Sequence, residues 1–329
     1  MILSPPATLE NEQIALWESI STKLVTLDDR VWEGRASGPG ISDWLSNFDG
    51  RTGASTEVER LHALYLLSQY MYYGQREIRI LLKAMYRELF LLPLVQQLHD
   101  EGVKQVDFSS RLTDELQRTR FLGVGNPSES GVHLLYFFRQ ENGLAKSNFL
   151  DAAQLYSTAT GPVGRYRTPR HPLVKRYIFL DDLCGSGETA YRYSTDLLPD
   201  LLDTDPSVEV HYFALFASSD GLRRVREHTV FGARCGAVHE LDNTYKWSDL
   251  QSRYLAALPE GISPSLLVSL AYTYGRRIWD DYPLGFDDGE LLLGFSHNTP
   301  DNTLPIIWGE EDNGSGEKWC PIFKRYPKV

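Results

Sequence analysis

The sequence predicts an α/β fold in which a mainly parallel sheet is flanked by helices, preceded by a helical region and followed by a C-terminal extension. Before residue 118, apolar residues such as Ile14, Trp17 and Leu24 recur roughly at helix spacing. From about residue 121 onward, short apolar runs alternate with helical patterns, which is typical of β-α-β units. These runs cover residues 121–124, 177–180, 208–216 and 237–241.

The elements follow in a simple order along the chain. A helical pattern over 11–28 ends at the Gly/Ser/Pro-rich break 34–40. Thr56 and Glu59 have the spacing of a capping box, which predicts a long helical segment running through residue 91. Near the C-terminus, the pattern predicts a strand, a turn-rich loop and another short strand. We therefore expect three parts: a helical N-terminal region (1–118), an α/β core (119–245) and a C-terminal extension packing on the core (246–329).

Composition and charge restrict the setting. The chain has 329 residues, of which 42% are hydrophobic and 23% charged, as in a soluble globular protein. Its apolar runs are too short to cross a bilayer, and no secretory signal is visible, so we expect a cytoplasmic protein without a membrane partner. Three widely spaced cysteines predict neither a disulfide framework nor a zinc site. The formal charge of −11 argues against nucleic-acid binding by the protein as a whole.

The most informative stretch is residues 175–192, "KRYIFLDDLCGSGETAYR". An apolar run ends in Asp181 and Asp182, and Gly185-Ser186-Gly187 follows before a helical pattern. In open α/β sheets, ligands bind at the carboxyl ends of the parallel strands. Glycines there allow close backbone approach, and backbone N–H groups hold phosphate, while carboxylates accept hydrogen bonds from sugar hydroxyls. The alternative is a strand end that only caps the next helix.

The nine residues "DDLCGSGET" (181–189) resemble the phosphoribosyl-pyrophosphate (PRPP) motif of type I phosphoribosyltransferases. The resemblance implies that fold for the core, with a hood-like C-terminal extension. It also implies that Asp181 and Asp182 contact the ribose hydroxyls and act in catalysis, with Mg²⁺ held indirectly by the same acids. The 5′-phosphate would lie on the loop formed by Gly185, Ser186, Gly187, Glu188 and Thr189. One departure is Glu188, which places an anion beside the expected phosphate.

Upstream, "FLGVGNPSESGVHLLYFFRQ" (121–140) reads as strand, loop and helix, in the position of that family's pyrophosphate loop. The resemblance assigns pyrophosphate contacts to Gly125, Asn126, Ser128 and Ser130. The residues alone equally allow a plain turn-rich connection. Together with "FSHNTPDNTLPIIW" (295–308), these blocks make the chain similar to phosphoribosyltransferase-like proteins of bacterial conflict, or anti-phage, systems. That resemblance implies a defence context and a defence-system partner protein.

A basic segment lies between the two loops. Arg165, Arg167, Arg170, Lys175 and Arg176 fall within twelve residues of an acidic protein. In the resembling family this region is a mobile loop that closes over the substrate, so its first three arginines are candidates for binding pyrophosphate. Two other interpretations stay open: a solvated basic loop, or contact with a nucleic-acid backbone.

Two further signals are weaker. His297 and Asn298 lie in the turn-rich "SHNTPDNT", where a structural turn competes with a place at the border of the site. Cys184 lies inside the phosphate loop without a readable His or Asp partner, which favours a plain small side chain.

Two functions remain. One is a phosphoribosyltransferase, or an enzyme that cleaves at the ribose C1 position, using positioning and electrostatics rather than a protein nucleophile. The other is a catalytically inactive sensor that binds a nucleotide in the same pocket and signals to a partner through the helical region. The sequence does not identify an acceptor base.

Overall fold

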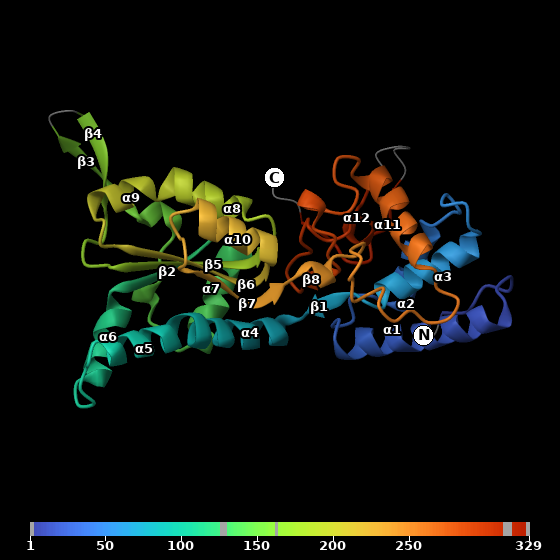
Figure 1. Cartoon of the computed structure of the whole chain (residues 1–329), viewed down its shortest axis with the longest axis horizontal. Helices are drawn as coiled ribbons and strands as arrows, with labels where there is room; N and C mark the ends of the chain where they lie inside the picture. The colour runs from blue at the N-terminus through green and yellow to red at the C-terminus, as the bar shows by residue number, and fades with distance from the viewer. Residues whose placement is uncertain (1–2, 126–129, 162–163, 312–317, 327–329) are drawn as a thin grey trace. The chain divides into compact units, whose positions relative to one another are not determined.

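The computed structural model describes residues 3–125, 130–161, 164–311 and 318–326. The chain divides into two compact units (Figure 1). Unit 1 comprises Met1–Glu77 and Asp242–Val329, and unit 2 comprises Ile78–Leu241. The structure therefore groups residues differently from the three expected parts, because the first 77 residues share a unit with the C-terminal segment.

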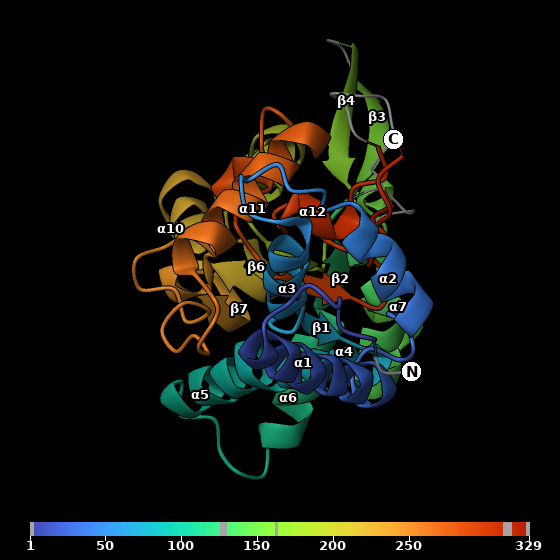
Figure 2. The ribbon, with the colours of Figure 1, turned by 90° about the vertical axis from the view of Figure 1, so that its right-hand side faces the viewer.

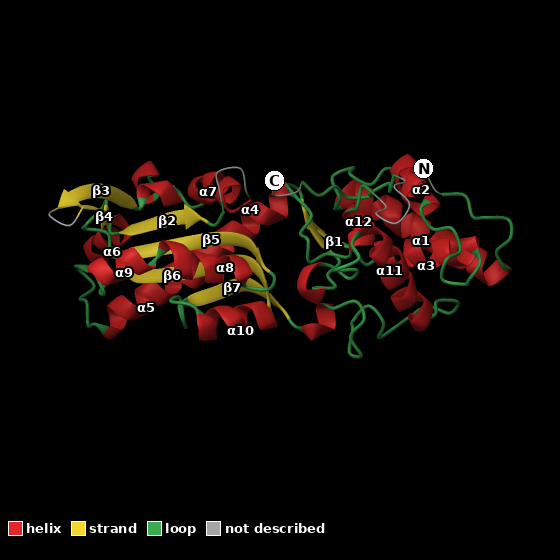
Figure 3. Ribbon diagram, turned by 90° about the horizontal axis from the view of Figure 1, so that it is seen from above, coloured by secondary structure: helices red, strands yellow, loops and turns green. Residues whose placement is uncertain are grey.

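Unit 2 is built on a four-stranded sheet in the order β2-β5-β6-β7, and every neighbouring pair is parallel (Figure 3). Its members are β2 (Thr119–Gly123), β5 (Arg176–Cys184), β6 (Glu209–Ser218) and β7 (Cys235–Leu241). Each coincides with an apolar run of the sequence. The predicted parallel α/β sheet is confirmed.

Helices cover both faces of this sheet, as Figure 1 shows. On one face, Phe179 and Tyr212 pack in a buried cluster with residues of α8, α9 and α10. On the other face, Phe121 contacts the rings of Phe90 and Phe138. Alternate side chains of a strand point to opposite faces, so a sheet covered on both sides needs continuous apolar runs. The helices of unit 2, including one that begins three residues before it, are α4 (Gln75–Ala84), the π-helix η1 (Met85–Leu91), α5 (Leu92–Asp100), α6 (Phe108–Gln117), α7 (Ser130–Glu141), α8 (Glu188–Arg192), the π-helix η4 (Tyr193–Leu197), α9 (Pro199–Thr204) and α10 (Ser219–His228).

A separate antiparallel hairpin interrupts the βα alternation. It is formed by β3 (Tyr156–Gly161) and β4 (Gly164–Pro169), and it carries part of the basic segment. Two short 3₁₀ turns precede it, η2 (Lys146–Asn148) and η3 (Ala152–Gln154).

Unit 1 is mainly helical and combines both ends of the chain. Its longer helices, labelled in Figure 2, are α1 (Asn11–Arg30), α2 (Gly38–Ser46), α3 (Thr56–Leu67) and α11 (Pro264–Ile278). Its shorter elements are α12 (Pro305–Trp308), the 3₁₀ turns η5 (Asn243–Tyr245) and η6 (Phe286–Asp288), and a parallel pair formed by β1 (Met71–Tyr73) and β8 (Leu293–Phe295). Within the described ranges, no helix has the length and apolarity that crossing a membrane requires.

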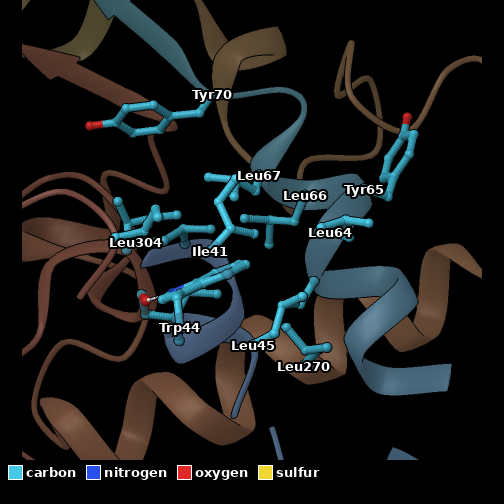
Figure 4. Close-up of a cluster of buried hydrophobic side chains, with 14 of the residues drawn as sticks. Ile41, Trp44, Leu45, Leu64, Tyr65, Leu66, Leu67, Tyr70, Leu270 and Leu304 are labelled. Atoms are coloured by element: carbon cyan, nitrogen blue, oxygen red, sulfur yellow. Dashed lines mark hydrogen bonds between the residues drawn. The ribbon is translucent and has the colours of Figure 1, made fainter. Parts of the chain in front are cut away.

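The core of unit 1 joins segments that are far apart in sequence. Ile41, Trp44 and Leu45 of α2 lie among leucines of α3 and beside Leu270 and Leu304 (Figure 4). The Trp44 indole is fully buried and donates a hydrogen bond to the Ile306 carbonyl (2.7 Å). The N-terminal helices therefore depend on the C-terminal segment for their packing.

The long helical segment predicted from Thr56 to residue 91 is wrong in two respects. Ser55, rather than Thr56, caps α3, because its side chain accepts a hydrogen bond from the Val58 N–H. The helix also ends at Leu67, and β1 separates it from α4. The pairing of β1 with β8 satisfies backbone groups that a local pattern assigns to a helix.

Glu59 has a structural role instead of the predicted capping role. Its carboxylate is fully buried and accepts hydrogen bonds from the Gly50 N–H (2.7 Å), the Thr52 N–H (2.6 Å), the Thr52 hydroxyl (2.5 Å) and the Tyr274 hydroxyl (2.5 Å). A buried carboxylate is stable only when its oxygens are satisfied in this way. Glu59 thereby ties the loop after α2 to α11.

We predict that Glu59→Gln destabilises the protein by about 3 kcal/mol, because an amide NH₂ group would face donors that now meet an oxygen. Chemical denaturation followed by circular dichroism measures this loss. Glu18→Gln, at an exposed position of α1, is the control and should change stability by less than about 0.5 kcal/mol. Equal stability of the two variants would contradict the role assigned to Glu59.

Candidate functional site

The two adjacent acids at the end of β5 have different environments. Asp181 is 7% exposed, and its Oδ2 accepts a hydrogen bond from the buried Tyr212 hydroxyl (2.8 Å). Its Oδ1 accepts the Asp182 N–H (2.9 Å). Asp182 is half-buried and accepts the Leu183 N–H (2.8 Å). The pair read as one unit in the sequence therefore consists of a buried acid and a more exposed one.

Cys184 packs against this acid pair and is almost completely buried, at 2% exposure. Burial, together with the nearby Asp181 carboxylate, raises the pKa of the Cys184 thiol to about 12. Burial, followed by the charge of Asp181, also raises the pKa of Tyr212 well above its usual value. A buried thiol of this kind is a poor nucleophile, as expected for a plain small side chain.

The glycine loop after β5 is fastened to the start of α10. The Ser218 hydroxyl donates to the Gly185 carbonyl (2.5 Å) and accepts the Gly221 N–H (2.9 Å), so the residue that caps α10 also holds the loop. A Cβ at position 221 would lie 2.1 Å from the Gly185 oxygen, which only glycine avoids. Gly187 has a φ of +76°, in the left-handed region that favours glycine. The loop's shape is thus set by backbone contacts before any ligand is considered.

The unexpected anion of the loop, Glu188, is compensated. Its Oε2 pairs with the Arg224 guanidinium (2.7 Å), and its Oε1 lies 3.4 Å from the Arg192 Nε. Arg224 also donates to the Ser186 carbonyl (3.3 Å). Two cations therefore offset the negative charge that stood against phosphate binding.

A tyrosine joins the two predicted phosphate loops. The Gly125 N–H donates to the Tyr193 hydroxyl (2.6 Å), which donates back to the Gly125 carbonyl (2.8 Å). Tyr193 follows α8, and Gly125 follows β2, so the beginnings of both loops lie at the same edge of the sheet. Asn126 and Ser128 lie outside the described residues, and Ser130 begins α7.

The structure does not bring the hairpin arginines to this edge. Figures 1 and 3 show β3 and β4 at the opposite end of the sheet from α8. Arg167 is exposed there, 3.6 Å from the Asp200 carboxylate and over the Tyr156 ring. Arg165 is also exposed on β4, and the Arg170 N–H donates to the Leu155 carbonyl (2.9 Å).

The other two cations of the basic segment hold the sheet together. Lys175 pairs with Asp205 (2.9 Å), and the buried Arg176 lies between Glu209 (2.9 Å) and Glu115 (3.4 Å). These residues stabilise the amino end of β5, so only the hairpin arginines are left as candidates for a ligand.

His297 and Asn298 belong to unit 1, where they follow β8. Asn298 closes a turn by accepting the Thr299 N–H (2.9 Å) and the Tyr326 N–H (2.9 Å). The His297 ring lies parallel to that of Phe295, with centroids 5.4 Å apart. Their place at the border of the site stays a prediction.

Several residues of the site were not identified from the sequence. Ser218 stands before a helical pattern and could have been found as an N-cap. Tyr193, Tyr212 and Arg224 gave no local signal, because each acts on a segment more than 30 residues away.

The parallel sheet and the glycine loop at its carboxyl edge are features of α/β proteins that bind ligands at strand ends. The family model described as PRTase-CE matches residues 41–325, so the chain belongs to this family of phosphoribosyltransferase-like proteins of conflict systems. The resemblance inferred from the sequence is confirmed at this level.

Comparison with solved structures gives weaker likenesses. A protein of Aquifex aeolicus, AQ2163, is 12% identical, with 63% of this chain and 86% of that chain covered and a TM-score of 0.29. The xanthine-guanine-hypoxanthine phosphoribosyltransferase of Helicobacter pylori is 14% identical, with 41% and 82% covered and a TM-score of 0.22. Comparison with curated proteins gives no match. Both TM-scores are low, so the fold assignment comes from the sheet itself.

We predict that Arg224→Ala loosens the loop, because it removes an ion pair and a hydrogen bond to the Ser186 carbonyl. Hydrogen exchange of the 185–189 amides should become roughly fivefold faster, equivalent to about 1 kcal/mol for one partly exposed ion pair and its hydrogen bond. The neighbouring Arg223 pairs only with Asp220 among the described contacts, so Arg223→Ala is the matched control. Unchanged exchange in Arg224→Ala would show that Ser218 and Gly221 hold the loop without it.

Proposed function

We propose that the chain binds a ribose-5-phosphate compound, PRPP or a related nucleotide, at the carboxyl end of β5. The observation that carries this proposal is the glycine loop, which backbone contacts hold against α10 beside the half-buried Asp182. Such a preformed loop costs little ordering entropy when a phosphate binds to its N–H groups. Membership of a phosphoribosyltransferase-like family supports the same class of ligand.

Within this proposal the two acids have separate roles. Asp182 contacts the ribose hydroxyls, since it is the more exposed of the two. Asp181 adds negative charge and orients Asp182 by accepting its N–H. The 5′-phosphate lies on Gly185, Ser186, Gly187, Glu188 and Thr189. Gly125 with Asn126, Ser128 and Ser130 forms the pyrophosphate side.

In a transferase, Mg²⁺ would bind with PRPP. Among the described residues, no group of three or more His, Cys, Asp or Glu side chains could hold a metal alone. Mg²⁺ often takes most of its ligands from phosphate oxygens and water, with one or two carboxylates from the protein, so Asp182 and Asp181 fit this supporting role. The ion would neutralise the leaving pyrophosphate. The chain's own acids would stabilise positive charge on the ribose as the bond at C1 breaks.

A nucleotide sensor is the second candidate, and the position of the hairpin favours it. Arg165, Arg167 and Arg170 would have to move to the other end of the sheet to reach pyrophosphate. Without that movement the site would bind the ribose phosphate but would supply little positive charge for a leaving group. In an anti-phage system, such a protein would signal its nucleotide state to a partner protein through the N-terminal helices.

We predict that PRPP, a nucleoside monophosphate or ribose 5-phosphate raises the melting temperature in the presence of Mg²⁺. A ligand at about a hundred times its dissociation constant adds roughly 2.7 kcal/mol of stability. Differential scanning fluorimetry measures the shift, with ribose as the control that lacks phosphate. Should none of the three phosphates stabilise the protein, the proposed ligand class is wrong.

We further predict that Asp182→Asn separates binding from turnover. The amide still accepts a hydrogen bond from a ribose hydroxyl, so nucleotide affinity should stay within about tenfold of the parent, or roughly 1.4 kcal/mol. Transition-state charge stabilisation is lost, so pyrophosphate release from PRPP with a panel of bases should fall about a hundredfold.

Two controls complete this measurement. Asp203→Asn, at an exposed position of α9, should change neither quantity. Saturating Mg²⁺ must be kept constant in every assay. If the parent binds the nucleotide tightly but releases no pyrophosphate with any base, the sensor is the function.

A further inference from the structure

Unit 1 contains a pocket of its own, with a volume of about 290 Å³. It lies between the turn after β8 and the C-terminal segment, with β1 and the loop before α2 completing its wall. Part of the 295–308 block, which the β5 site does not use, forms one side of it. The lining residues are Arg35, Gly40, Tyr72, residues 295–299, residues 321–324 and Tyr326.

The pocket is positively charged in a protein of formal charge −11. Arg35 and Lys324 line it, and none of its lining residues is Asp or Glu. The nearest acids are engaged elsewhere: Glu33 accepts the Tyr72 hydroxyl (3.2 Å) and the Gln75 N–H (2.9 Å). Asp301 pairs with Arg325 (2.8 Å). A local excess of positive charge of this kind attracts an anion.

The pocket also offers flat aromatic surfaces. The His297 ring stacks on Phe295 at an interplanar angle of 8°, which leaves the other face of the imidazole for a planar group. Tyr326 is 63% exposed at the rim, and Tyr72 stacks on Phe323 at 5.6 Å. Aromatic faces beside cations suit a ligand that has both a planar ring and a negative charge.

The walls are held before any ligand binds. Asn298 fixes the C-terminal segment through the Tyr326 N–H (2.9 Å) and carbonyl (3.3 Å). Arg325 adds a hydrogen bond to the Thr299 carbonyl (3.0 Å). On the opposite side, Glu33 has a φ of +55°, a left-handed conformation that costs a non-glycine residue energy. That strain lies in the turn that presents Arg35.

We infer that this pocket binds a small aromatic phosphate, the chemistry of a nucleoside monophosphate. Arg35 and Lys324 hold the phosphate, and the base lies against His297 and Tyr326. This site is separate from the loop at 185–189 and does not depend on the function proposed for that loop.

The experiment uses the full chain and AMP as the probe, measured by isothermal titration calorimetry. Adenosine and inorganic phosphate are tested separately, and each should bind at least tenfold more weakly than AMP because each lacks one half of the contacts. Arg35→Ala/Lys324→Ala should weaken AMP binding at this site at least tenfold, which is the loss of about one charge-assisted hydrogen bond. Arg30→Ala/Lys318→Ala removes two cations of unit 1 outside the pocket lining and should leave affinity unchanged.

Photolabelling with 8-azido-AMP, followed by peptide mapping, distinguishes this site from the β5 loop. We expect label on peptides containing residues 295–299 or 321–326, lost in Arg35→Ala/Lys324→Ala. Label near 185–189 reports on the proposed ribose-phosphate site and should persist in that variant. Absence of label on both unit 1 peptides in the parent, or equal label in the variant, would overturn the inference.

Discussion

The close approach of two backbones, at Gly185 and Gly221, is the constraint on which the candidate site depends. A side chain at position 221 would collide with the Gly185 carbonyl, so the loop after β5 can lie on α10 only because both positions are glycine. Ser218 and Arg224 flank Gly221 at helix spacing and contact the same loop. One face of α10 therefore shapes the loop, and the parallel β5–β6 pair fixes where α10 begins. The site is a consequence of sheet register rather than of the loop sequence alone.

Charge compensation explains how an acidic loop can still bind an anion. Glu188 carries a negative charge where a phosphate is expected, but Arg224 and Arg192 neutralise it from two helices. The neighbouring Asp181 is held by Tyr212 inside the sheet's cover, so Asp182 is the more exposed carboxylate at the strand end. The net charge facing a ligand is accordingly less negative than the sequence suggests. An incoming phosphate meets backbone N–H groups rather than uncompensated acids.

The sequence predicted those features that depend on neighbouring residues. The strands of the parallel sheet and the acid-to-glycine boundary at the end of β5 are local patterns, so their prediction was sound. The contacts of Tyr193 and Arg224 were not predictable, because folding joins segments that share no periodicity. The same applies to β1, whose pairing with β8 across more than 200 residues interrupts a helical pattern. The association of both chain ends in one unit, through contacts such as that of Trp44 with the Ile306 carbonyl, also has no local signal.

Whether the site catalyses transfer depends on where positive charge lies. Asp181 follows Arg176, at the start of β5, by five residues, or about 17 Å of strand. The hairpin is joined to that amino end, where Arg167 lies beside Asp200 on α9. An exposed ion pair of this kind contributes at most about 1 kcal/mol, so it would not prevent the hairpin from moving. A ligand carrying pyrophosphate could stabilise a closed form, because several charge-assisted hydrogen bonds outweigh one surface pair. A monophosphate offers too little charge to do so. The chain can therefore distinguish the two ligands by hairpin position alone, and this property serves an enzyme and a sensor equally well.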